Sequence, residues 1–160
     1  MQDDVLITVY ASAPRRIFAV GALGVLGLML IYLAIMRPPA ELHLQVFLIV
    51  LGVAVLWLTG KLRRATLVGL ELTHTQLRDT QGDVLAELDN IASLDRSLFA
   101  YKPSNGFLIR LKDKMPRRWE PGMWWRTGRR IGVGGVAAAA QTKAMSEIMS
   151  AMIAERDMSA

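Results

Sequence analysis

Two long segments without a charged residue constrain this chain more than any other feature. Residues 17–36, IFAVGALGVLGLMLIYLAIM, and residues 44–60, LQVFLIVLGVAVLWLTG, contain no Asp, Glu, Lys or Arg. An α-helix rises about 1.5 Å per residue, so helices of these lengths come close to the thickness of a bilayer's hydrocarbon core. The connection RPPAELH is short, and Pro38 and Pro39 end the first helix. The sequence therefore predicts a two-helix transmembrane hairpin.

Neither buried core helices nor a cleaved signal peptide fits these segments as well. A chain of 160 residues cannot enclose two helices that are apolar on all sides and also build a second core. The first segment exceeds the apolar length of a signal peptide, and no clear small-residue cleavage site follows it, so we expect it to be retained. Gly21, Gly24 and Gly27 recur every three residues on it. Such spacing allows close helix contact, within the hairpin or with a foreign helix, and we favour the hairpin.

Basic residues next to the spans set the expected orientation. Residues 15–16 are both arginine, and residues 61–64 contain Lys, Arg and Arg, whereas the intervening loop has only Arg37, opposed by Glu41. Because cytoplasmic flanks of membrane helices are enriched in Lys and Arg, both termini should be cytoplasmic. We expect a multi-pass protein of the bacterial inner membrane, with residues 1–16 as a cytoplasmic segment.

Residues 61–160 are enough for one small cytoplasmic domain. Alternation and β-branched residues predict one or two strands in residues 66–78, and DTQGD (79–83) predicts a turn with Gly82 at positive φ. Residues 84–98 fit a helix about as well as a strand. Residues 107–112 predict a strand, and after a loop at 113–123 residues 124–133 predict a final strand. VLITVY (5–10) strongly favours β structure and can add an edge strand to the same sheet.

The last predicted element is a helix over residues 137–156, which are rich in strong helix formers. Its apolar residues recur at helical spacing and form one stripe, consisting of Met145, Ile148, Met149, Met152 and Ile153. The simplest use of the stripe is to close a small sheet. A Met-rich helix that binds the groove of a partner is the alternative.

The order of these elements resembles a family. The residues that carry the resemblance are VGLELTHTQLRD (68–79), GFLIRLK (106–112) and the helix from Ala137. In this order, after a short β segment and two membrane helices, they resemble small bacterial membrane proteins with a pleckstrin-homology-like (PH-like) domain. The resemblance implies a half-open antiparallel barrel capped by a C-terminal helix, hence a small α+β domain, and no catalytic chemistry common to the members. The basic, Trp-containing segment departs from that pattern, so the resemblance assigns it no role.

Few residues suggest catalysis. The chain has no cysteine, and His43 and His74 are isolated, so we predict no metal site, no catalytic residues and no cofactor. GRRIGVGG (128–135) before a helix is similar to loops that hold phosphate on backbone N–H groups. It matches neither G-x-G-x-x-G nor G-x-x-x-x-G-K-[ST], and a glycine-rich turn is the better interpretation.

The basic stretch is the main candidate site. Residues 110–130 contain eight Lys or Arg and two acidic residues, interleaved with tryptophans. Nucleic acid could attract such charge, but a domain tethered to a bilayer has the anionic leaflet as its nearest negative surface. We therefore predict an anchor to lipid or to a membrane partner, without nucleic acid. The candidate binding residues are Arg117, Arg118, Trp119, Trp124, Trp125, Arg126, Arg129 and Arg130.

A purely structural role for the same residues stays open, with one tryptophan in the core and solvated arginines. Trp124 and Trp125 must in any case face opposite sides of a strand, because neighbouring strand residues alternate.

Three functions remain, in order of preference. The first is a non-catalytic accessory or assembly subunit of a larger membrane complex, such as an energy-converting one. Its partners would be integral membrane proteins, and its spans contain no charged residue that could carry ions. The second is a stand-alone membrane-tethered module that binds anionic phospholipid or another anionic ligand. The third, least supported, is a hydrolase or transferase.

Overall fold

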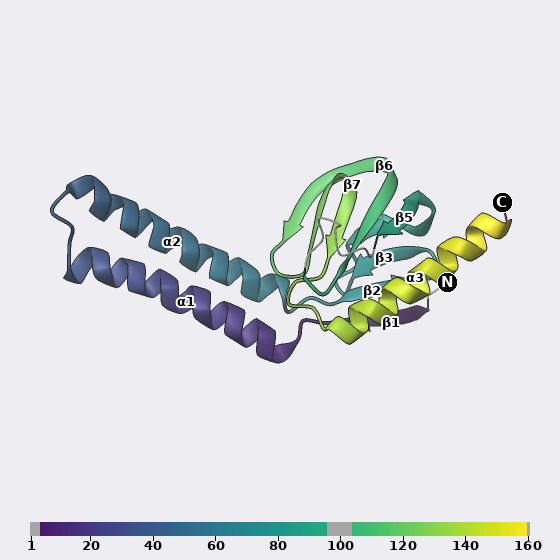
Figure 1. Ribbon diagram of the computed structural model, residues 1–160, viewed down its shortest axis with the longest axis horizontal. Helices are drawn as coiled ribbons and strands as arrows, with labels where there is room; N and C mark the ends of the chain where they lie inside the picture. The colour runs from purple at the N-terminus through teal and green to yellow at the C-terminus, as the bar shows by residue number, and fades with distance from the viewer. Residues whose placement is uncertain (1–3, 96–103, 160) are drawn as a thin grey trace. The chain divides into compact units, whose positions relative to one another are not determined.

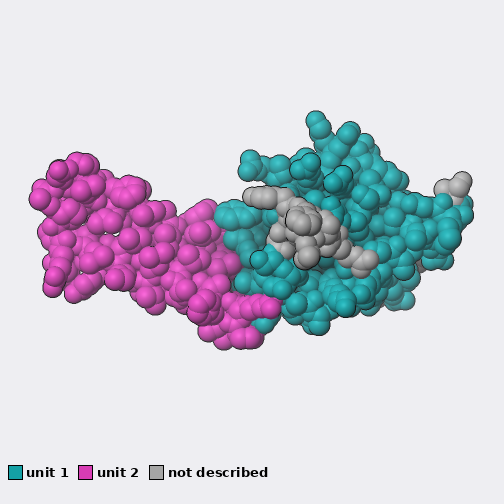
Figure 2. Space-filling model, in the orientation of Figure 1, with its two compact units in different colours: residues 1–12, 65–160 teal, residues 13–64 magenta. Residues whose placement is uncertain are grey.

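The computed structural model describes residues 4–95 and 104–159 of the chain. The chain forms two compact units, shown in different colours in Figure 2. Unit 1 comprises residues 1–12 and 65–160, and unit 2 comprises residues 13–64. The helical hairpin is therefore an insertion between an N-terminal strand and the remainder of unit 1.

Unit 2 is a pair of antiparallel helices, α1 (Ala13–Met36) and α2 (Leu42–Ala65), of 24 residues each (Figure 1). Both are long and apolar enough to cross a membrane. They extend past the uncharged segments, because α1 already begins before Arg15 and α2 continues through Lys61 and Arg64. Arginine and lysine are good helix formers, so a helix need not end where its apolar run ends.

Close contact between the two helices depends on Gly27 and Gly52. A Cβ atom on Gly27 would lie 2.8 Å from a side chain of α2, and one on Gly52 would lie 2.7 Å from a side chain of α1. At Gly24 the nearest such atom is 3.8 Å away, and at Gly21 nothing lies within 4 Å. Of the three regularly spaced glycines, Gly27 is the one whose missing side chain permits the hairpin contact.

The described residues of unit 1 form two antiparallel sheets. The first has the order β1-β2-β3-β4 and the second the order β5-β6-β7. The N-terminal strand pairs with β2, so it does add an edge strand to the first sheet. The strands are β1 (Val5–Val9), β2 (Leu70–Thr73), β3 (Gln76–Asp79), β4 (Val84–Glu87), β5 (Ile91–Asp95), β6 (Phe107–Glu120) and β7 (Trp124–Val133).

Local chemistry explains the turn between β3 and β4. The Asp79 carboxylate accepts hydrogen bonds from the backbone N–H groups of Gln81 and Asp83, both at 2.9 Å. Gly82 has φ +95°, a conformation that favours glycine. The turn predicted at residues 79–83 is therefore confirmed.

Two segments differ from the sequence-based expectation. Residues 84–95 are neither one helix nor one strand: β4 and β5 are separated by a short 3-10 turn, η1 (Leu88–Asn90), and residues 96–98 lie outside the described part. The loop predicted at residues 113–123 is wrong, because β6 continues to Glu120 and only a short turn precedes β7. Cross-strand pairing with β7 supports the extended backbone there, although Pro116 and several charged residues disfavour a strand locally.

One hydrophobic core lies inside unit 1 and receives residues from both sheets and from helix α3 (Ala139–Ser159). The helix contacts β1 and β5, which are edge strands of the two sheets. Met145, Met149 and Ile153 are buried in the core, and Ile148 and Met152 pack against it. The predicted stripe therefore closes the sheets, and it is not free to bind a partner.

Candidate functional site

The candidate residues lie on the two strands of the β6–β7 hairpin. Arg117, Arg118 and Trp119 belong to β6, and the remaining five belong to β7. Trp119 pairs with Trp125 and Arg118 pairs with Arg126 across the two strands. The pairing shows which residues of β6 and β7 lie opposite each other. Whether a side chain can contact a ligand depends on the face of the hairpin from which it projects.

Trp124 and Arg126 face the interior of unit 1. Their exposed fractions are 4% and 7%, and Trp124 belongs to the hydrophobic core. The guanidinium carbons of Arg118 and Arg126 lie 5.5 and 5.9 Å from the centre of a Trp124 ring, so both are within cation–π range. Trp124 is thus a core residue, as expected if this segment has a structural role.

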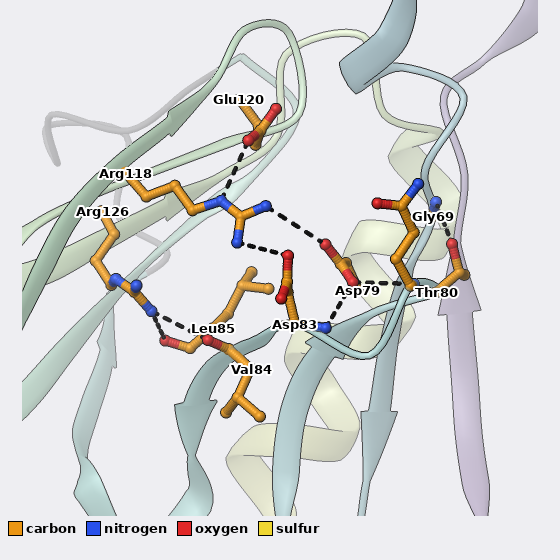
Figure 3. Close-up of polar contacts among 10 residues, drawn as sticks. Gly69, Asp79, Thr80, Asp83, Val84, Leu85, Arg118, Glu120 and Arg126 are labelled. Atoms are coloured by element: carbon orange, nitrogen blue, oxygen red, sulfur yellow. Dashed lines mark hydrogen bonds and ion pairs between the residues drawn. The ribbon is translucent and has the colours of Figure 1, made fainter.

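Arg126, one of the candidate binding residues, is buried in this fold and makes structural hydrogen bonds. Its Nη1 donates to the carbonyl oxygens of Leu85 at 2.8 Å and Val84 at 3.1 Å (Figure 3). Its Nε donates to the carbonyl oxygen of Pro116 at 2.8 Å. The pairing of β3 with β4 is irregular next to Val84. Backbone carbonyl oxygens of β4 are therefore left to accept hydrogen bonds from a side chain. Burial lowers the pKa of Arg126, chiefly by desolvation and less by the charge of Arg118.

Arg118 is the centre of an ion-pair cluster. Its Nη1 donates to Asp83 at 2.8 Å, its Nε donates to Glu120 at 3.2 Å, and its Nη2 lies 3.9 Å from the Asp79 carboxylate. Figure 3 shows Arg118 and Arg126 reaching from the hairpin toward the β3–β4 turn. The hydrogen bond to Asp83 is the main cause that raises the pKa of Arg118. Arg118 therefore links the two sheets, and its charge is already compensated.

Trp125 lies on the opposite face of β7. Strict alternation would place Arg130 with Trp124 and Arg126, but Gly128 has φ +59° and the pairing with β6 is irregular around it. This irregularity changes the phase of the strand, so that Trp125 and Arg130 line the same groove. A bulge with a glycine at positive φ commonly has this effect.

The strand also curls around the Trp125 indole. A Cβ atom on Gly132 would lie 2.5 Å from Nε1 and Cε2 of Trp125, seven residues away on the same strand. Seven residues of straight strand would span about 23 Å, too far for an indole to cover. Figure 1 shows β6 and β7 strongly curved, which accounts for the contact.

The outer face of the hairpin therefore forms a groove, which we call the Trp–Arg groove. Its volume is about 560 Å³, and its lining residues are Arg117, Arg118, Trp119, Trp125, Thr127 and Arg130. The Trp119 side chain is 47% exposed. Arg117, Arg129 and Arg130 are exposed, and none of them forms an ion pair with an acidic residue in the described part of the chain.

The structure places the eight predicted residues in four different settings. Arg117, Trp119, Trp125 and Arg130 line the groove. Trp124 and Arg126 are interior, Arg118 lines the groove from within its ion-pair cluster, and Arg129 is exposed but does not line the groove. Sequence reasoning missed Thr127, and the glycine at position 128 between polar residues was the available signal for a bulge.

The glycine run after β7 does not resemble a phosphate loop in its hydrogen bonding. The backbone N–H groups of Gly134, Gly135 and Val136 donate to the carbonyl oxygens of Met123, Ser104 and Gly122 at 2.7–2.9 Å. Donors that are already used inside the fold cannot cradle a phosphate. The glycines are needed for packing instead, because a Cβ on Gly135 would lie 2.6 Å from the Gly122 oxygen.

The described residues contain no group of three or more His, Cys, Asp or Glu side chains that could hold a metal ion. His43 is exposed and lies 3.0 Å from Glu41 in the turn of the hairpin. His74 lines a separate cavity of about 440 Å³ with Asp89, Glu155 and Arg156 among others. The Nη1 atom of Arg156 donates hydrogen bonds there to the carbonyl oxygens of Leu88 and Ile91.

The chain matches no protein-family model, and no curated protein and no solved structure is significantly similar to it.

Proposed function

We propose that this chain is a non-catalytic integral membrane protein that serves as an accessory or assembly subunit of a larger membrane complex. Unit 2 would be its membrane hairpin, in the bacterial inner membrane, and unit 1 its cytoplasmic docking domain. Both termini would be cytoplasmic, because basic residues flank the hairpin on the side of the termini.

The observation that carries this proposal is the exposure of the hairpin's apolar side chains. Phe18, Leu28, Phe47 and Trp57 are each more than half exposed, and they come from both helices. Contact between α1 and α2 therefore covers only a narrow stripe of each. Apolar surface on this scale is stable in lipid or against other apolar helices, and in water it would cause aggregation.

Unit 1 fits a PH-like domain, which we include in the proposal. A four-stranded and a three-stranded antiparallel sheet share one core, and a C-terminal helix contacts an edge strand of each. These features support the PH-like assignment that we propose. The resemblance implies no catalytic chemistry common to the members, so we expect unit 1 to dock rather than catalyse.

The docking surface would be the outer face of the β6–β7 hairpin. It combines exposed guanidinium groups with a half-exposed indole, and Arg and Trp are enriched where proteins bind partners. We expect its partners to be integral membrane proteins and anionic phospholipid, without nucleic acid and without a cofactor.

Purification of the tagged full-length chain from membranes in a mild detergent tests this function. We expect the chain to migrate on a native gel with a large assembly whose other subunits can be identified. Energy-converting complexes, respiratory or photosynthetic, are the first hosts to examine. Release from membranes by alkaline carbonate would contradict the membrane assignment. Migration only as a free small species would contradict the subunit assignment.

A second function is favoured by the Trp–Arg groove itself. A stand-alone, membrane-tethered module that binds anionic lipid or another anionic ligand would need such a groove and no partner protein. This alternative predicts the free small species in the same native gel, together with a loss of ligand binding when the groove arginines are replaced.

A further inference from the structure

We propose that the Trp–Arg groove is a binding site for the phosphate headgroup of an anionic phospholipid in the bilayer that holds the hairpin. The proposal deepens the function above and rests on it in one respect, namely that unit 2 lies in a bilayer. It applies equally to a subunit of a complex and to a stand-alone module.

The groove has the chemistry of a phosphate site with apolar walls. Arg117 and Arg130 supply guanidinium groups, and Thr127 supplies a hydroxyl group. A guanidinium group can donate two parallel hydrogen bonds to phosphate oxygens, which makes arginine well suited to this group. Trp119 and Trp125 form a cross-strand pair beside them, and indole rings favour the headgroup region of a membrane.

The charge distribution shows which arginines are available. Arg118 is bound by Asp83 and Glu120, with Asp79 near, so the protein already neutralises it. Arg117 and Arg130 have no acidic partner in the described ranges, 4–95 and 104–159. Two uncompensated cations lining one groove repel each other, and an anion between them removes that repulsion.

The connection between the units favours lipid over an acidic protein. Three residues separate β1 from α1, and four separate α2 from β2. Four residues of chain span at most about 14 Å, so a bilayer around the hairpin keeps its headgroups at a high effective concentration near unit 1. Each basic residue close to an anionic leaflet contributes about 1 kcal/mol, which corresponds to about fivefold in binding.

The absence of cysteine from the sequence gives a direct experiment. The full-length chain carrying Thr127→Cys in the groove is placed in nanodiscs of phosphatidylcholine, with or without phosphatidylglycerol. Its rate of alkylation by N-ethylmaleimide, an uncharged reagent, is then measured. We expect phosphatidylglycerol to slow the reaction severalfold, because the headgroup occupies the groove. Glu87→Cys, at an exposed residue of β4, is the control and should change little.

Matched charge removals test whether the groove itself binds the lipid. Arg117→Gln and Arg130→Gln should each weaken the protection by about fivefold. Arg129→Gln removes the same charge from the next residue, which does not line the groove, and it should retain the protection. Equal effects of Arg129→Gln and Arg130→Gln would overturn the proposal, since they would indicate diffuse attraction. Circular dichroism of each variant confirms that unit 1 is folded.

Three further outcomes of these experiments would overturn the proposal. An alkylation rate that phosphatidylglycerol leaves unchanged overturns the proposal. Protection by soluble polyglutamate in phosphatidylcholine discs, with no protection by phosphatidylglycerol, overturns it in favour of an acidic protein partner. Protection by free glycerol phosphate as strong as by phosphatidylglycerol overturns the lipid assignment and indicates a soluble phosphate ligand. Failure of the proposed function appears separately, as carbonate extraction or as the absence of a co-purifying assembly.

Discussion

The indole of Trp125 occupies the space next to Gly132 where any other residue would place its Cβ atom. The two residues lie seven positions apart on β7, and the separation of that Cβ from the indole would be only 2.5 Å. Curvature of the hairpin brings them together, and the same curvature makes the outer face of β6 and β7 hollow.

Replacement of Gly132 by alanine should therefore displace the Trp125 indole and open the Trp–Arg groove. Overpacking of this kind costs about 1–3 kcal/mol, because a rigid ring must move away from the new methyl group. Thermal unfolding followed by near-UV circular dichroism should show a decrease of several degrees in the Tm of unit 1. Gly128→Ala is a useful comparison, since Gly128 has open space around it but a φ of +59°. An unchanged Tm and unchanged tryptophan fluorescence in Gly132→Ala would contradict the packing described.

Arg126 should be needed for the stability of unit 1 rather than for binding. Arg126→Met removes the donor from the carbonyl oxygens of Val84, Leu85 and Pro116, and unsatisfied buried acceptors cost about 1–3 kcal/mol. Arg129→Met changes the same side chain at an exposed position, so its effect should stay within about 0.5 kcal/mol. Chemical denaturation of both variants measures the difference. Similar free energies of unfolding for the two would show that the buried bonds contribute little.

Replacement of a glycine in the helical hairpin should destabilise it only where the glycine lies at the contact between α1 and α2. Gly52→Ala places a methyl group 2.7 Å from a side chain of α1 and 3.1 Å from the backbone oxygen of Gly27. It should lower the thermal stability of the full-length chain in detergent. Gly21→Ala meets nothing within 4 Å and raises helix propensity, so stability should be unchanged or higher by about 0.5–1 kcal/mol. The reverse order would indicate that Gly21, and not Gly52, carries the helix contact.

Membrane orientation can be tested with single cysteines in this cysteine-free chain. Asp4→Cys and Ser159→Cys should resist a membrane-impermeant maleimide in intact cells and react in inverted vesicles, because both termini are expected in the cytoplasm. Glu41→Cys, in the turn between the helices, should show the opposite pattern. Labelling of Ser159→Cys in intact cells would reverse the proposed orientation.

Much of the fold follows from local features of the sequence. Uninterrupted apolar runs predict the two helices, and the spacing of Met145, Met149 and Ile153 predicts the face of α3 that is buried. The turn at Gly82 and the strand after Gly106 also follow from neighbouring residues. Each of these features depends on the spacing of apolar residues or on a turn conformation, and both can be recognised within a short stretch of sequence.

Other features depend on contacts between distant residues, and only the tertiary structure decided them. Residues 113–120 look like a loop by composition, yet they form strand because β7 pairs with them. Arg126 and Arg130 look equivalent in the sequence, but the phase change at Gly128 directs one to the carbonyl oxygens of β4 and the other to the groove. Charge and aromatic content alone cannot distinguish a buried cation from an available one, because burial is set by strands that are far apart in the chain.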